Sequence, residues 1–144
     1  MRNRIQSAEQ LKKKGWDGSL FCQLCREVEL TKHIIFSYPL AHSVWCVWRD
    51  ALLWGQVPYS SDDVFLLMDM RLISKCRAVK LSLLASTVWT LWLTRNHMVF
   101  RDNIAYSHLI LLFQIISHLM QWKPMLPPEE KHKMEALVAH LRGQ

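Results

Sequence analysis

Apolar residues recur every three to four positions along most of this chain, which is the period of an α-helix that buries one face. The pattern predicts helices over residues 8–14, 40–53, 62–69, 75–102, 106–122 and 127–141. Ser7 has the position of an N-cap, and Gly15 and Gly55 follow predicted helix ends. We therefore predict an all-α fold, a small multi-helix globule with an irregular loop before the second helix.

The longest predicted helix, residues 75–102, has two contrasting faces. We expect its apolar side to be buried, with Leu81, Leu84, Val88, Leu91, Trp92 and Val99. Trp89 lies in the same apolar run and is also expected in the core. Another face carries residues that we call the polar stripe: Thr87, Thr90, Thr94, His97 and Arg101. We predict that this stripe is an exposed recognition surface.

Residues 106–122 are apolar around most of the helix circumference. Such a helix is buried centrally, packs against a partner or contacts lipid. His108, Gln114 and His118 interrupt the run, which therefore falls short of the roughly 18–20 apolar residues of a membrane span. We predict no transmembrane span, and peripheral membrane contact stays open.

The chain has 144 residues, 51% of them hydrophobic, which suits one packed domain. We divide it into residues 1–55 and residues 56–144, which we expect to pack together as one domain. Its four cysteines follow no secretory signal, which favours a reducing, intracellular compartment. The sequence leaves nucleus, cytosol and mitochondrion open.

The formal net charge is +6, and part of the excess lies near the start of the chain. Clustered cations can bind phosphates, although most such clusters are only solvated faces. Arg95 and Asn96 offer donors and acceptors that suit a phosphate or a base edge, and the alternative is that they cap and tether neighbouring loops. The candidate nucleic-acid contacts are Arg2, Arg4, Lys12, Lys13, Lys14, Arg95 and Arg101.

Cys22, Cys25 and His33 form the one constellation in the sequence that suggests chemistry. Two cysteines in a Cys-x-x-Cys spacing can direct both sulfurs at one tetrahedral zinc ion, and a following histidine can supply a third ligand. The alternative is that these residues pack as small buried side chains with no metal. Cys46 and Cys76 lie in apolar helical surroundings and are read as core.

The residues around this constellation follow a known pattern. They are Arg4–Leu11, Lys14-Gly15-Trp16, Cys22-Gln23-Leu24-Cys25, Glu29, His33, Phe36, Pro39, Ala41, Val44 and Trp45. This stretch resembles the zinc-binding region (zf-RVT type) of plant LINE-type, non-LTR retrotransposon reverse transcriptases. Residues 89–101, with two tryptophans, Arg95-Asn96 and Phe100, are similar to the segment that follows it. The resemblance implies a retroelement origin, zinc binding through Cys22, Cys25 and His33, and an ancestral nucleic-acid role.

The chain departs from the family pattern at Tyr38, where the resemblance implies a cysteine as fourth ligand. A phenol with a pKa of about 10 is a poor zinc ligand beside thiolates and imidazole. His42 and Cys46 are candidate substitutes, although they lie about one and two helical turns farther along. The sequence thus leaves two alternatives, a retained zinc site and a metal-free relic with no cofactor.

Enzymatic motifs are missing from the sequence, which has no Gly-rich phosphate loop, nucleophile elbow or acidic cluster for two metal ions. We expect a non-enzymatic protein, a free-standing degenerate fragment of a retroelement. Three hypotheses follow. The first is a helical interaction protein that binds a protein partner, or itself, and acts as a regulator, inhibitor or toxic factor. The second is a nucleic-acid-binding zinc knuckle, and the third is a chain with no selected activity beyond folding.

Overall fold

The computed structural model describes residues 6–69, 75–101 and 107–143. Within these ranges the regular structure is helical, which confirms the all-α prediction. The elements are α1 (Ala8–Lys13), the π-helix η1 (His33–Ser37), α2 (Pro39–Ala51), α3 (Ser61–Asp69), α4 (Arg77–Arg101), α5 (His108–Trp122), the short 3-10 helix η2 (Lys123–Met125) and α6 (Pro128–Arg142). An irregular loop between α1 and η1 contains both cysteines of the predicted zinc knuckle.

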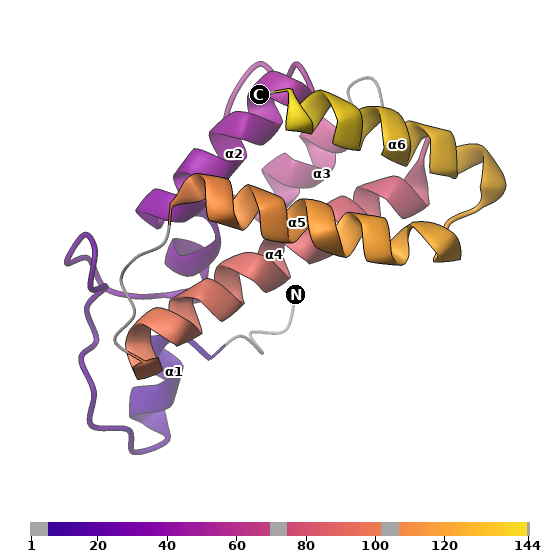
Figure 1. The fold of residues 1–144 in the computed structure, drawn as a ribbon. Helices are drawn as coiled ribbons and strands as arrows, with labels where there is room; N and C mark the ends of the chain where they lie inside the picture. Colours follow the sequence, from indigo (N-terminus) through magenta and orange to yellow (C-terminus); the bar gives the residue numbers. More distant parts are fainter. Residues whose placement is uncertain (1–5, 70–74, 102–106, 144) are drawn as a thin grey trace.

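The helices pack around one continuous core. Helix α5 runs back along α4, α6 lies against α2, α4 and α5, and α1 lies near the C-terminal end of α4 (Figure 1). The largest fully buried side chains include Trp45, Trp48, Leu83, Leu91, Leu111, Ile115, Leu119 and Met134. The core therefore contains residues from both sides of the division at residue 55, and that division stays a prediction.

Helix α4 buries the face that sequence patterning assigned to solvent. Thr87, Thr90 and Thr94 of the polar stripe are buried, so the prediction that the stripe is an exposed recognition surface is wrong for this part of it. The Oγ1 atoms of Thr87 and Thr94 donate to the carbonyls of Leu83 and Thr90, both at 2.8 Å. A threonine bonded within its own helix presents mainly a methyl group to its neighbours, so it can occupy a core position.

The opposite correction applies to two large apolar residues of α4. Trp89 is 48% exposed and Leu81 is 49% exposed, although both were expected in the core. The ring of Trp89 lies against that of Trp92, with centroids 5.2 Å apart. Leu91 is fully buried, as predicted.

Helix ends follow the capping residues closely. Ser7 Oγ accepts from the backbone N–H of Gln10 at 3.4 Å and caps α1, as predicted. At α3 the cap is Ser60, whose Oγ accepts from the N–H of Asp63 at 3.2 Å. Among the described residues, no helix is both long and apolar enough to cross a membrane.

Candidate metal centre

The loop that carries the two cysteines is closed by backbone hydrogen bonds. The N–H of Cys22 donates to the carbonyl of Glu27 at 2.8 Å, and the N–H of Arg26 donates to the carbonyl of Cys22 at 3.0 Å. Arg26 has a φ of 66°, the left-handed conformation that tight turns often need. This turn brings Cys22 and Cys25 to one side of the loop.

His33 completes a group of three candidate metal ligands. Its Nε2 lies 3.4 Å from Cys25 Sγ, and the ligand atoms of Cys22, Cys25 and His33 all lie within 4.8 Å of one another. Zinc bonds of about 2.0–2.3 Å place neighbouring tetrahedral ligand atoms roughly 3.3–3.8 Å apart. The three residues therefore fit a zinc ion after small side-chain adjustments, in agreement with the predicted ligands.

The other ring nitrogen of His33 faces a carboxylate. Nδ1 lies 3.6 Å from Glu27 Oε2, while Nε2 is directed at the cysteines. A metal-bound histidine commonly has its second nitrogen bonded to a carboxylate, which fixes the tautomer and raises the basicity of the ligand. His33 is buried at the start of η1, where the N–H of Tyr38 donates to its carbonyl at 2.7 Å.

Tyr38 stands beside this group without joining it. It is 3% exposed, and its hydroxyl donates to Met98 Sδ at 2.7 Å. Burial raises the pKa of the Tyr38 phenol, and the nearby Cys22 and Glu29 raise it further. The residue at the family's fourth ligand position is therefore a neutral, hydrogen-bonded phenol at neutral pH.

The structure does not bring the two candidate substitutes into the group. His42 is exposed on α2, and Cys46 is half-buried one turn later and packs against the hydrophobic core. In the part of the chain that the structure describes, neither belongs to a set of three or more ligand atoms that lie together. The described ligand group thus consists of Cys22, Cys25 and His33.

Arg95 is the clearest correction to the predicted nucleic-acid contacts. It is 1% exposed, and its Nε donates to Glu29 Oε1 at 2.8 Å, while Nη2 bonds to the same oxygen. Nη1 donates to Asn96 Oδ1 at 3.1 Å. The guanidinium is therefore enclosed and its charge is offset, so Arg95 cannot bind a phosphate in this structure.

Glu29 is a residue whose importance the sequence analysis missed. It is 3% exposed, and its Oε1 accepts from the N–H of Ala8 at 3.2 Å as well as from Arg95. One carboxylate thus joins the start of α1, the cysteine loop and α4. The only sequence signal was its place in the family pattern, because acidic residues are rarely buried.

The remaining basic candidates are exposed or lie outside the described residues. Arg2 and Arg4 lie outside the described residues. The side chains of Lys12, Lys13 and Lys14 are exposed at the end of α1, as is Arg101 at the end of α4. Contact between the rings of Trp16 and Phe100, with centroids 6.3 Å apart, holds these two helix ends close together.

The geometry of the loop agrees with a comparison against protein families. Residues 1–45 match the family of zinc-binding regions in reverse transcriptases. The match contains all three ligands and Tyr38, and it confirms the resemblance for this region. A plant LINE source and an existence as a free-standing chain stay predictions. Searches of curated proteins and of solved structures found no match to this chain.

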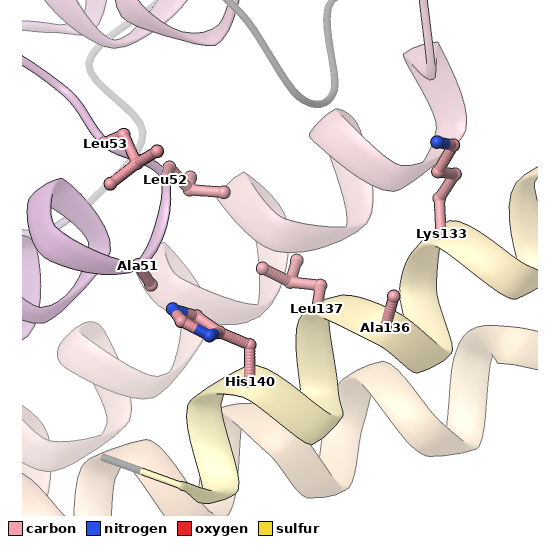
Figure 2. A pocket seen from close by; sticks show the side chains of 7 residues that line it. All are labelled: Ala51, Leu52, Leu53, Lys133, Ala136, Leu137 and His140. Carbon is pink, nitrogen blue, oxygen red and sulfur yellow. The ribbon is translucent and has the colours of Figure 1, made fainter.

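A second feature, far from the zinc-binding region in the sequence, is a pocket between the end of α2 and α6. Its volume is about 310 Å³, and its lining residues are Ala51, Leu52, Leu53, Lys133, Ala136, Leu137 and His140. Figure 2 shows the imidazole of His140 pointing from α6 toward Ala51, with Lys133 two turns earlier on the same helix. The pocket is therefore apolar with two basic side chains on one wall.

Proposed function

We propose that this chain is a non-enzymatic, zinc-binding protein of retroelement origin that binds a protein partner at the α2–α6 pocket. The observation that carries the proposal is the combination of an apolar floor and two basic side chains that have no hydrogen-bond or ion-pair partner among the residues that the structure describes. Partner binding of this kind would let the chain act as a regulator, an inhibitor or a toxic factor, because a partner surface that this chain covers cannot bind another protein.

The floor of the pocket suits an apolar anchor side chain. Ala51, Leu52 and Leu137 are buried, and the volume of about 310 Å³ accommodates one large or two small apolar side chains. Buried anchors that fill such pockets contribute much of the binding energy in protein interfaces. The floor therefore supports recognition of a Leu, Met, Phe or Trp in the partner.

The rim extends the apolar surface beyond the pocket. Leu53 is 58% exposed and is held at a φ of 55°, an unusual backbone conformation for a leucine. Ala136 is also exposed. Small-molecule sites usually enclose most of the ligand surface, whereas a pocket continued by an exposed apolar rim suits a longer peptide segment.

Charge selects the flanking residues of that segment. Among the described residues, neither the Lys133 ammonium nor the His140 imidazole has a hydrogen-bond or ion-pair partner. By contrast, Lys123 of η2 forms an ion pair with Glu135 of α6. Together with the net charge of +6, this favours a partner with Asp or Glu beside the apolar anchor.

The test is a selection of displayed peptides on the full-length, zinc-loaded chain, followed by affinity measurements on matched variants. Ala136→Trp fills the pocket, and Ala139→Trp places the same side chain at an exposed position of α6 outside the pocket. We expect the selected peptides to combine an apolar residue with a carboxylate and to lose at least about tenfold in affinity with Ala136→Trp only. Lys133→Glu should weaken binding more than the control Lys131→Glu.

Another docking surface would give a different result. Helix α5 exposes Leu109, Ile110, Phe113 and Met120 and has no Asp, Glu, Lys or Arg. If Phe113→Ser abolishes peptide binding and Ala136→Trp does not, the partner docks on α5 and the pocket assignment is wrong. Peptides without any acidic preference would contradict the role given to Lys133 and His140.

Nucleic-acid binding is the second candidate function, because the exposed Lys12, Lys13 and Lys14 lie close to the end of α4 with Arg101. Each phosphate contact on single strands should contribute about −0.7 to the slope of log affinity against log salt. The test is binding of a single-stranded RNA at several salt concentrations, with the three lysines replaced by Gln. A steep slope that flattens in the variant would support this function, and salt-independent or absent binding would exclude it.

A further inference from the structure

We infer that the metal centre has three protein ligands, Cys22, Cys25 and His33, and that it takes a thiolate from outside the chain as its fourth ligand. This inference concerns the zinc-binding region and does not depend on the α2–α6 pocket. It goes beyond the family match, whose pattern supplies the fourth ligand from within the region.

The first step is that, in the described ranges, no further cysteine or histidine lies at the site. All four cysteines and all seven histidines of the sequence lie within the described ranges, so no undescribed residue is a hidden thiolate or imidazole. Among them only Cys22, Cys25 and His33 lie together. His42 is exposed on α2, and Cys46 packs toward the core.

The second step is that Tyr38 does not close the site. Its hydroxyl donates a hydrogen bond to Met98 Sδ at 2.7 Å, so the proton of the phenol is directed at the core. The ring is 3% exposed and lies edge-on to His33, with centroids 6.2 Å apart. Zinc with three protein ligands keeps a fourth position for an exogenous ligand.

The third step concerns access and charge. A shallow hollow of about 480 Å³ lies against the cysteine loop, and Ser19, Phe21, Cys22, Gln23 and Arg26 line it, with Cys22 itself 1% exposed. Cys25 is partly exposed. The guanidinium of Arg26 favours an anionic donor, and thiolate is the anionic donor that zinc prefers beside cysteine and histidine.

The test uses the full chain loaded with Co²⁺, which occupies zinc sites and reports its ligands by absorption. The protein is kept reduced with a phosphine, so that the solution contains no small-molecule thiol at the start. N-acetylcysteine amide is then titrated in, with its S-methyl derivative as control. We expect a saturable rise of the sulfur-to-cobalt charge-transfer band, from a two-thiolate to a three-thiolate intensity, with the thiol only.

Two variants at one position make the outcome decisive. Tyr38→Cys restores a cysteine at the family's position and should give the three-thiolate spectrum without added thiol and no further response. Tyr38→Phe keeps the ring, removes only the hydroxyl, and should respond to thiol as the natural chain does. If Tyr38→Phe loses cobalt or changes its spectrum before thiol is added, Tyr38 is a ligand and the inference is wrong.

The thiol titration of the natural chain can also overturn the inference. If one Co²⁺ binds and a large excess of thiol leaves the spectrum unchanged, the fourth position is closed or refuses thiolate, and the inference is overturned. The same holds if His42→Ala or Cys46→Ser alters the spectrum. A comparison of N-acetylcysteine amide with a peptide that contains one cysteine identifies the source: tighter binding of the peptide indicates a protein cysteine, and equal binding indicates a free thiol.

Discussion

Arg95 of α4 donates from Nε to Oε1 of Glu29 at 2.8 Å, and both side chains are almost completely buried. The two residues are 66 positions apart, so this ion pair joins the cysteine loop to the longest helix of the chain. The same oxygen accepts from the N–H of Ala8 at 3.2 Å, which adds the start of α1. The N-terminal zinc-binding region is therefore anchored on the helical core by one carboxylate.

Removal of either partner should destabilise the protein strongly. Glu29→Gln keeps an oxygen for Ala8 and leaves the Arg95 charge buried without compensation, and such a loss costs about 3–5 kcal/mol. Arg95→Met should have a similar effect because it strands the carboxylate. Urea unfolding of the metal-free protein measures both. The double variant Glu29→Gln/Arg95→Met should lose less unfolding free energy than the two single variants lose together, because the two side chains interact. A loss under about 1 kcal/mol for Arg95→Met would contradict this role.

Two buried threonines of α4 allow a matched test of hydrogen bonding in the core. Thr87 Oγ1 accepts from the indole N–H of Trp48 at 3.1 Å, whereas Thr94 Oγ1 bonds to the carbonyl of Thr90 in its own helix. Thr87→Val leaves the buried indole N–H without an acceptor and should cost about 1–3 kcal/mol. Thr94→Val should cost less than about 1 kcal/mol, because the Thr90 carbonyl keeps its helical bond. Equal unfolding free energies for the two variants would show that the Trp48 bond is unimportant.

Glu27 should tune the metal affinity without being a ligand. Its carboxylate lies 3.6 Å from His33 Nδ1 and is mostly exposed to solvent. Loss of such a carboxylate typically weakens metal binding by about 10- to 100-fold. Competition with a zinc chelator should therefore give a weaker affinity for Glu27→Ala than for the control Glu135→Ala, which changes a carboxylate on α6. Indistinguishable affinities would mean that Glu27 does not orient His33.

Metal binding should weaken as the pH falls. Burial raises the pKa of the Cys22 thiol, so the metal-free protein holds this sulfur protonated at neutral pH. Zinc binds the thiolate and must release that proton, and the apparent affinity should therefore rise with pH until the thiol titrates. Calorimetry in two buffers with different ionisation enthalpies measures the released protons. An affinity that does not change between acidic and alkaline conditions would contradict ligation by Cys22.

The sequence predicted the helices well because their signals are local. The Ser7 cap, the apolar period and the Gly15 stop depend on neighbours within one or two turns, and α1, α2 and α4 begin and end within a few residues of the prediction. The three metal ligands also follow from short spacings. Such features need no knowledge of what packs against them.

The burial of α4 could not be predicted in the same way. Hydropathy assigns threonine and arginine to solvent, but Thr87, Thr90, Thr94 and Arg95 are buried because other elements cover that face and supply or replace their hydrogen-bond partners. Trp89 was assigned to the core because it lies in an apolar run, and it is instead half exposed. Which face of a long helix is covered depends on contacts between distant segments, and a single sequence does not contain that information directly.

The most direct test of the account is the zinc content of the purified, reduced full chain, measured by native mass spectrometry and by elemental analysis. We expect close to one zinc ion per chain in the natural protein, in His42→Ala and in Cys46→Ser, and none in Cys22→Ser or Cys25→Ser. Circular dichroism of the same samples establishes that the cysteine variants still fold. A folded natural chain without zinc, or zinc that persists in Cys22→Ser, would contradict the three-ligand metal centre.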